Sequence, residues 1–263
     1  MPFIAIFVTK QKYRIRLRYF IELQYNGGNY HGWQQQLNAV TIQEKLNNCL
    51  SILLKQTINV MGAGRTDTGV HAEQLFAHFD VECEFDEKLL IYKLNSILPS
   101  DIVIINIFKV KNDAHARFDA VSRSYEYRIW LGKNPFLREV TWQQNFSPSV
   151  AKMNEAACLL LNYKDFKCFS KSKTDVNNYN CSITEAVWKQ EGKLLTFHIS
   201  ADRFLRNMVR AIVGTLLEIG LEKITIEDFK KIIESRDRSE AGVSVPAQGL
   251  FLTKIVYPKE INE

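Results

Sequence analysis

With 263 residues, of which 46% are apolar and 24% charged, the chain has the composition of a globular protein that can bury one large core or two small ones. Its net charge of +5 indicates a mild preference for polyanionic partners. The five cysteines include no C-x-x-C pair and no apolar run is long enough to span a membrane, so we expect a cytoplasmic protein without a disulfide framework, zinc site or membrane contact.

Alternating apolar and polar side chains predict strands, and apolar side chains at helical spacing predict helices. The clearest strand begins the first part of the chain, where every second residue from Ile15 to Tyr25 is apolar. Thr41, with Glu44 three residues later, predicts the capped start of a helix whose apolar stripe continues to Leu54. The predicted order is strand, helix, strand, strand, helix and strand, at residues 15–25, 41–54, 57–61, 75–81, 86–98 and 101–110.

The second part of the chain repeats this order and adds one short helix. Its predicted elements are a strand at 122–131, a helix from about 148, strands at 182–189 and 194–200 joined by a turn at Glu191-Gly192, helices at 203–220 and after Thr225, and a strand at 249–257. Twice in one chain, this is the order of the split β-α-β motif. We therefore expect an α+β protein of two ferredoxin-like halves, residues 14–112 and 113–263, which share one mainly antiparallel sheet with a cleft between them.

The stretch GAGRTDTGVHA, residues 62–72, is too polar and too rich in glycine to serve packing. Asp67 at its centre has two interpretations, a structural turn residue or a carboxylate presented for chemistry. Asp67 is close in sequence to Arg65 and lies between two threonines, and the sequence has no cluster of metal ligands to which these groups could belong. These neighbours favour the interpretation of Asp67 as a reactive carboxylate. His71 stays open between a structural and a catalytic role.

Three arginines recur at helical spacing in the predicted helix 203–220. Arg203, Arg206 and Arg210 would form one stripe, which as an isolated feature is typical of a solvated basic face. Arg210 differs because it borders the apolar side of the helix, where an arginine needs a carboxylate partner. Asp67 is the candidate partner.

Seven stretches together resemble the tRNA pseudouridine synthase A family. They are GRTDTGVHA, YNGGNYHGWQQQ (25–36), NSILPSDI (95–102), AHARFDAVSRSYEYRI (114–129), KDFKCF (164–169), FLRNMVRAIVG (204–214) and VPAQGLFL (245–252), in the family's order. The chain departs from the family pattern at Thr68, where alanine is usual, and at Asn26, where aspartate is usual. The resemblance covers residues 14 to 257, so residues 1–13 are expected to be an N-terminal extension, either disordered or produced by the choice of start site.

The resemblance implies the pseudouridine synthase fold, with two ferredoxin-like halves around a basic cleft. It also implies a reaction that converts uridines in the anticodon stem-loop of tRNA to pseudouridine without a metal or cofactor, and a homodimer with one tRNA spanning both subunits. The absence of a cofactor agrees with the chemistry, because moving uracil from N1 to C5 attachment is an isomerisation. One carboxylate suffices, as a nucleophile toward the base or the sugar or as a base at C2′, and these routes stay open.

The resemblance also assigns roles to single residues. Asp67 matches the catalytic carboxylate, Arg210 the arginine expected to pair with it, and Tyr125 the tyrosine that packs on the target base; for Tyr125 a place in the core is the alternative. Arg65 is a candidate substrate contact. The candidate RNA contacts, for each of which an exposed solubilising charge is the alternative, are Arg117, Arg123, Arg203 and Arg206.

Two other classes of protein share single features of this sequence. Asp67-Thr68-Gly69 spells the triplet of aspartic proteases, but these enzymes need two carboxylates that share a proton and the chain has a single triplet. A non-catalytic RNA-binding module is the remaining alternative, because ferredoxin-like sheets bind single-stranded RNA through exposed aromatic side chains. No Gly-Phe-Gly-Phe-type run appears in the chain, and such a module has no use for a carboxylate held among glycines.

Overall fold

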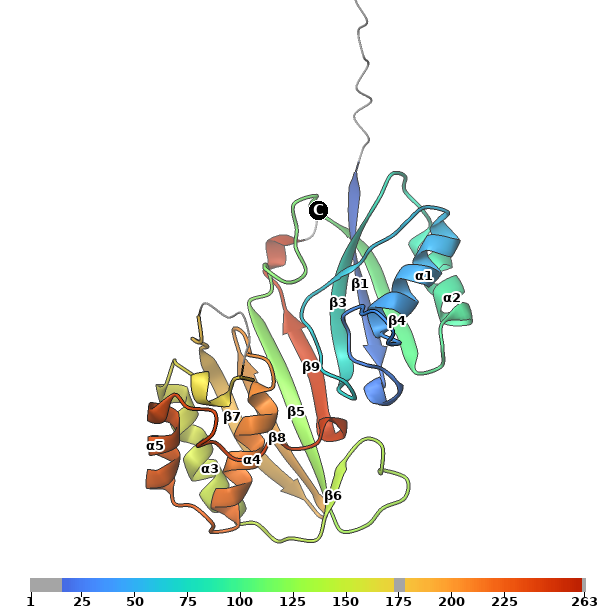
Figure 1. The fold of residues 1–263 in the computed structure, drawn as a ribbon. Coiled ribbons are helices and arrows are strands. Elements are labelled where there is room, and N and C mark those ends of the chain that lie inside the picture. The colour runs from blue at the N-terminus through green and yellow to red at the C-terminus, as the bar shows by residue number, and fades with distance from the viewer. Residues whose placement is uncertain (1–15, 173–177, 262–263) are drawn as a thin grey trace, which may run out of the picture.

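One nine-stranded sheet crosses the molecule in a computed structural model that describes residues 16–172 and 178–261 (Figure 1). Its main path runs in the order β4-β1-β3-β9-β5-β8-β7, with β2 paired to β3 and β6 paired to β5. The strands are β1 (Leu17–Tyr25), β2 (Met61–Gly62), β3 (His71–Val81), β4 (Ile102–Val110), β5 (Ser122–Leu131), β6 (Trp142–Gln144), β7 (Ile183–Glu191), β8 (Leu194–Ala201) and β9 (Leu250–Val256). Only the β3–β9 and β5–β6 pairs are parallel, which confirms the expected α+β class with a mainly antiparallel sheet.

Five α-helices pack on this sheet in two groups (Figure 1). They are α1 (Ile42–Leu54), α2 (Glu87–Ile97), α3 (Val150–Leu159), α4 (Met208–Gly220) and α5 (Ile226–Ser235). The last strand, β9, pairs with β3 on one side and with β5 on the other, so the end of the chain joins the two groups. The predicted boundary between residues 112 and 113 stays a prediction.

Both helix groups lie on the same face of the sheet. Residues paired across neighbouring strands project to the same side. Tyr25 is paired with Ala72, Ala72 with Leu252, and Leu252 with Tyr125, so Tyr25 and Tyr125 share a face. Alternate residues of β1 such as Leu23 pack in one core with α1, whereas alternate residues of β5 pack in a second core with α4. The space between the two helix groups therefore lies above the centre of the sheet, at β3, β9 and β5.

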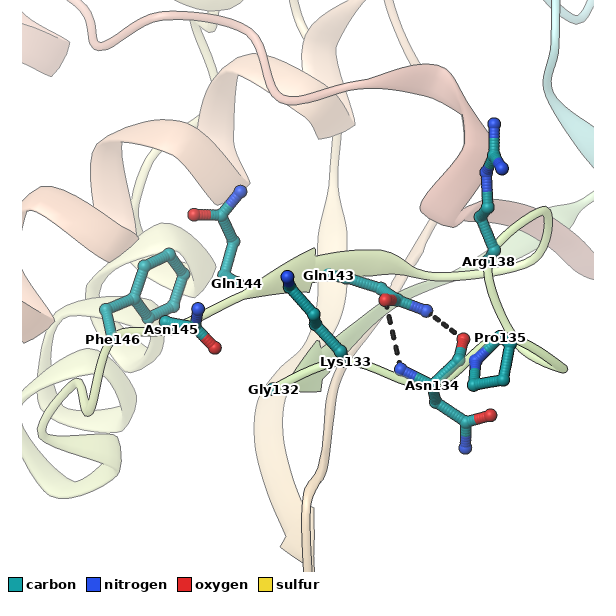
Figure 2. A pocket seen from close by; sticks show the side chains of 9 residues that line it. All are labelled: Gly132, Lys133, Asn134, Pro135, Arg138, Gln143, Gln144, Asn145 and Phe146. Atoms are coloured by element: carbon teal, nitrogen blue, oxygen red, sulfur yellow. Dashed lines mark hydrogen bonds between the residues drawn. The ribbon is translucent and has the colours of Figure 1, made fainter.

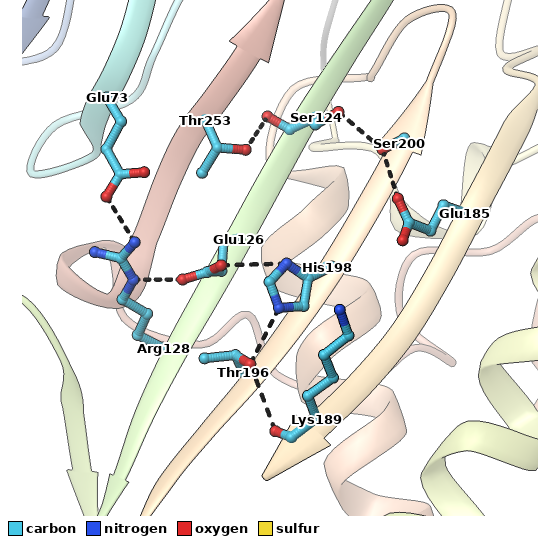
Figure 3. A network of polar contacts seen from close by, with 10 residues as sticks. All are labelled: Glu73, Ser124, Glu126, Arg128, Glu185, Lys189, Thr196, His198, Ser200 and Thr253. Carbon is cyan, nitrogen blue, oxygen red and sulfur yellow. Dashed lines mark hydrogen bonds and ion pairs between the residues drawn. The ribbon is translucent and has the colours of Figure 1, made fainter. Parts of the chain in front are cut away.

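The opposite face of the second helix group's strands carries a polar network (Figure 3). Arg128 of β5 makes ion pairs of 2.6 Å with Glu73 and 2.5 Å with Glu126. His198 of β8 places its Nδ1 3.1 Å from the second oxygen of Glu126. Acidic and basic groups are therefore paired with one another on this face.

A loop at residues 111–121 covers that same face of the sheet beside β1 and β3. His78 of β3 accepts a hydrogen bond from the backbone N–H of Ala116 at Nδ1 (3.1 Å), and Tyr257 donates to the carbonyl of the same residue (2.6 Å). Arg18 of β1 reaches the carbonyl of Ala114 (2.8 Å). Burial lowers the pKa of His78 to about 4, and the charge of Arg18 contributes to this shift. His78 is therefore held neutral under the loop.

The structure confirms most predicted elements, corrects three boundaries and adds one strand. Thr41 and Thr225 accept hydrogen bonds from the backbone as helix N-caps, and Gly192 forms the β7–β8 turn with φ of +58°. The strand predicted at 57–61 is reduced to β2, the strand predicted from 75 begins at His71, and β6 was not predicted. The helix predicted from 203 begins at Met208, because Asn207 adopts the left-handed conformation with φ of +68°. The expected extension at residues 1–13 lies outside the described residues.

Candidate active site

The turn that carries Asp67 connects β2 to β3 and is fixed by the loop that follows β1. The carbonyl of Thr66 accepts a hydrogen bond from Trp33 N–H (3.2 Å), and the N–H of Gly69 donates to the carbonyl of Tyr30 (3.3 Å). The Thr66 hydroxyl lies 2.8 Å from the hydroxyl of Tyr25, in a buried contact. These bonds hold the backbone on both sides of Asp67, whose side chain stays 28% exposed. A fixed backbone thus presents one accessible carboxylate.

A cavity of about 520 Å³ opens beside this carboxylate. Its walls come from the turn that carries Asp67, from the start of α4 and the segment before it, and from two loops of the second part of the chain. Four of the lining side chains are basic and Asp67 is the acidic one; the lining residues are Asp67, Thr68, Lys171, Ser172, Arg206, Asn207, Arg210 and Arg238. Such an excess of positive charge around one carboxylate favours a polyanionic ligand.

Asp67 has a different ion-pair partner from the one expected. Arg206 places its Nε 3.3 Å from Asp67 Oδ1, whereas Arg210 donates from Nε to the carbonyl of Val245 at 2.6 Å. The prediction of an Asp67–Arg210 pair is therefore wrong for this structure, although both residues line the cavity. Because the helix begins only at Met208, Arg206 precedes it and extends toward Asp67, and the expected stripe of three arginines on one helix face does not form.

Tyr125 stands at the junction of the two cores. Its ring packs edge-on against Phe204, with ring centroids 5.1 Å apart, and it is packed against both core clusters. Burial raises the pKa of Tyr125 to about 12; the charge of Arg123 opposes the shift and that of Asp67 adds to it. Tyr125 therefore lies within electrostatic reach of Asp67, on the face of the sheet that holds the helices.

Arg123 binds protein backbone, although the sequence predicted it as an RNA contact. Its guanidinium donates to four carbonyls: Nη1 to Ala120 (3.0 Å) and Asp202 (2.8 Å), and Nη2 to Ala63 (3.3 Å) and Arg117 (2.6 Å). Burial lowers the pKa of Arg123 from its ordinary value. Ala63 precedes the turn that carries Asp67, and Asp202 precedes the segment with Arg206, so one side chain connects both sides of the site.

The other predicted arginines lie outside the walls of the cavity. Arg65, in the turn that carries Asp67, is exposed. Arg117, whose guanidinium lies 5.6 Å from the ring centroid of Phe118, is exposed as well. Arg203 is half-buried. Their roles as substrate or RNA contacts stay predictions.

His71 connects three segments behind the turn. Its Nδ1 accepts a hydrogen bond from Gly27 N–H at 3.1 Å, so the proton is on Nε2, which donates to the carbonyl of Gln248 at 3.0 Å. The ring stacks on Phe251 with a centroid distance of 4.6 Å. Burial, followed by the charge of Arg128, lowers the pKa of His71. Both ring nitrogens are occupied by backbone groups, which identifies His71 as a structural residue of the site.

Two basic residues of the cavity were missed by the sequence analysis. Lys171 follows the KDFKCF block, and its N–H donates to the carbonyl of Arg206 at 3.0 Å. Arg238 follows α5 and donates to the carbonyl of Ala241 and to the Ser244 hydroxyl. Neither residue has a helical or strand periodicity that would have placed it near Asp67. Only the matching of the KDFKCF block pointed to the neighbourhood of Lys171.

Within residues 16–172 and 178–261, no three His, Cys, Asp or Glu side chains are grouped so that they could hold a metal ion. In the same residues, no helix combines the length and the apolar composition needed to cross a membrane.

The sequence is similar to those of known proteins over nearly its whole length. A family model described as tRNA pseudouridine synthase matches residues 156–258. Proteins called tRNA pseudouridine synthase A from Parabacteroides distasonis and Bacteroides fragilis are 49% and 51% identical to the chain; the matches cover 93% and 94% of this chain and 97% and 98% of those proteins. The chain belongs to the tRNA pseudouridine synthase A family. A protein of the same name from Thermoanaerobacter sp. is 38% identical over 90% of this chain and 98% of its own.

Membership of the tRNA pseudouridine synthase A family confirms the resemblance seen in the sequence blocks. The match spans both helix groups, because more than nine-tenths of the chain aligns with the Parabacteroides distasonis protein. The α+β architecture of this chain, with one mainly antiparallel sheet, is consistent with the pseudouridine synthase fold expected from the sequence. The cavity at Asp67 is the place in this architecture where a carboxylate meets an excess of basic side chains.

Proposed function

We propose that the protein isomerises uridine to pseudouridine in tRNA, with Asp67 as the catalytic carboxylate. The observation that carries the proposal is a fixed, partly exposed carboxylate at the wall of a cavity with four basic side chains. Membership of the tRNA pseudouridine synthase A family supports the reaction, and the basic walls suit an RNA substrate.

The reaction breaks the bond from uracil N1 to C1′ and forms a bond from C5 to C1′. The proton on C5 leaves and N1 gains a proton, so atoms and electrons balance within the nucleotide. Asp67 acts as a nucleophile toward the base or the sugar, or as a base at C2′. Each of these roles needs an ionised carboxylate, and the guanidinium Nε of Arg206 lies 3.3 Å from Asp67 Oδ1.

Tyr125 is the proposed surface against which the target base packs. It lies on the helix-bearing face of the sheet, and Asp67 contributes to its raised pKa. The base must leave its stack in the RNA, which costs a few kcal/mol and is offset by contacts in the pocket. Arg210 and the exposed Arg65 are proposed to contact the substrate, and Arg206 to exchange its contact with Asp67 for one with a phosphate.

Three finer points are proposals from the family resemblance. The target uridines lie in the anticodon stem-loop, the protein acts in the cytoplasm, and the working form is a homodimer with one tRNA spanning both subunits. A sedimentation mass of two chains at micromolar concentration is the expected result for the dimer. A mass of one chain would remove that proposal without touching the reaction.

Incubation with unmodified tRNA tests the function itself. We expect pseudouridine to accumulate over many turnovers, with no nucleotide or redox cofactor added, and the anticodon stem-loop to be the modified region. Binding of tRNA without any product would instead identify a non-catalytic RNA-binding protein. Pseudouridine-specific chemical labelling of the product identifies which uridines are modified, independently of how much pseudouridine forms.

A further inference from the structure

The loop between β5 and β6, residues 132–141, is ordered by its own side chains (Figure 2). The Gln143 side chain binds Asn134 twice: its oxygen accepts from the Asn134 N–H (3.1 Å) and its amide donates to the Asn134 carbonyl. Asn134 in turn accepts from Phe136 N–H at 3.0 Å, and the Thr141 hydroxyl donates to the carbonyl of Leu137 at 2.7 Å. The tip of the loop therefore has a fixed conformation.

This loop is fastened to the segment behind the catalytic turn. The Gln248 side chain donates to the carbonyl of Thr141 at 3.1 Å and to that of Arg138 at 3.4 Å. The backbone carbonyl of Gln248 accepts the hydrogen bond from His71, which begins β3 four residues after Asp67. A chain of three contacts thus links the loop to the strand that carries the turn, and the loop has a defined place relative to Asp67.

The loop presents a solvent-exposed aromatic ring. Phe136 at its tip is 92% exposed. Its neighbour in the chain, Pro135, lines a cavity of about 620 Å³ with two basic side chains, several amides and no carboxylate among its lining residues, which are Gly132, Lys133, Asn134, Pro135, Arg138, Gln143, Gln144, Asn145 and Phe146 (Figure 2). An exposed ring in a loop that also supplies basic and amide groups to a cavity matches an unpaired nucleotide, because its base stacks on aromatic side chains and its phosphate binds Lys and Arg.

We propose that loop 132–141 and this cavity bind a second, unpaired nucleotide of the tRNA, with its base stacked on Phe136 and its phosphate at Lys133 and Arg138. The proposal rests on the proposed function, since the tRNA is the ligand. Charge selects RNA over a protein partner: both ionised side chains of the lining are cationic, and the amides of Gln144 and Asn145 can bind base edges or phosphate oxygens. The loop would then hold the RNA at a fixed distance from Asp67.

The affinity of three variants for unmodified tRNA tests the stacking. Phe136→Ala should weaken binding roughly ten-fold, in the range found when a stacking ring is removed, whereas Phe136→Tyr should stay within about two-fold of the parent protein. Tyr92→Ala is the matched control, because Tyr92 is also an exposed aromatic residue (71%) but lies on α2. Its affinity should not change. All three substitutions are at the surface, and equal melting temperatures verify that the fold is intact.

The salt dependence of binding tests the phosphate contact. Arg138→Gln should reduce the slope of log affinity against log salt concentration by about one, and Lys93→Gln, an exposed charge on α2, should leave it unchanged. Equal affinities of Phe136→Ala and Tyr92→Ala would overturn the proposal, as would an equal loss in Phe136→Ala and Phe136→Tyr. These are binding measurements, so they differ from failure of the proposed function, which is seen as an inactive parent protein.

Discussion

Replacing Gly32 by alanine should displace the turn that carries Asp67. Gly32 has φ of +86°, and a Cβ added there would lie 2.3 Å from the carbonyl oxygen of Thr66 and 3.1 Å from the carbonyl carbon of Asp67. The turn must therefore retreat by at least about 0.7 Å before the closer contact reaches 3.0 Å, and the bond from Trp33 N–H to Thr66 is strained or lost. The left-handed backbone costs alanine about 1–2 kcal/mol, and the lost hydrogen bond about 1 kcal/mol more.

The rate should fall further than the stability implies, because a displacement near 1 Å in an active site can reduce the rate about 10²-fold. Gly192→Ala is the matched control: Gly192 also has positive φ (+58°), but no atom lies within 4 Å of its added Cβ. Both variants should lose stability in thermal denaturation. Only Gly32→Ala should lose single-turnover pseudouridine formation at saturating enzyme. Equal rates for the two variants would refute the inference that the packing of Gly32 positions Asp67.

Three further predictions concern the clamp, the acid response and metal ions. Arg123→Lys keeps the charge but cannot reach four carbonyls, so the single-turnover rate should fall about 10²-fold, while the tRNA affinity and its salt dependence stay unchanged. A normal rate in Arg123→Lys, together with a weaker salt dependence of tRNA binding in Arg123→Gln, would instead show that Arg123 contacts an RNA phosphate. The pKa of His78 falls from 6.5 to about 4 on folding, because its charged form is disfavoured in the fold. The free energy of unfolding should therefore be highest above pH 6.5 and should fall by roughly 3 kcal/mol as the pH drops to about 4. In His78→Asn, whose side-chain oxygen can accept from Ala116 but does not titrate, urea denaturation should show a smaller loss over this pH range than in the parent protein, because His71, whose pKa is also lowered, still titrates. Pseudouridine formation should continue in EDTA, and a loss that one added metal restores would contradict the proposed chemistry.

Much of the fold was predictable because local patterns and tertiary packing agree. The alternation from Leu17 to Tyr25 marks a strand whose alternate residues are buried, and Thr41 and Thr225 cap helices as their sequences indicate. The errors arose where three-dimensional contacts decide. β6 has only three residues, too few for a periodicity, and is held by its parallel pairing with β5. The apolar spacing around Phe204 continued the helical pattern, but Asn207 breaks the helix with a left-handed backbone.

The sequence predicted where the site lies, but it did not predict which side chains contact one another there. The glycine-rich turn identified Asp67, because the residue types alone were unsuited to packing. Which arginine faces it could not be derived, since helical spacing placed Arg206 and Arg210 on one stripe and the structure gives them different partners. Arg123 was assigned to RNA from its charge, whereas its use of four backbone carbonyls depends on segments far apart in the sequence.

Substitution of Asp67 by asparagine tests the central claim most directly. Asparagine keeps the size of the side chain and an oxygen that can accept from Arg206, but removes the negative charge and the nucleophile. Pseudouridine formation in unmodified tRNA should fall by at least roughly 10²-fold, the lower bound for loss of a general base, while the variant still binds tRNA and melts cooperatively. If Asp67→Asn forms pseudouridine at a rate near that of the parent protein, Asp67 is only a turn residue and the proposed mechanism is wrong.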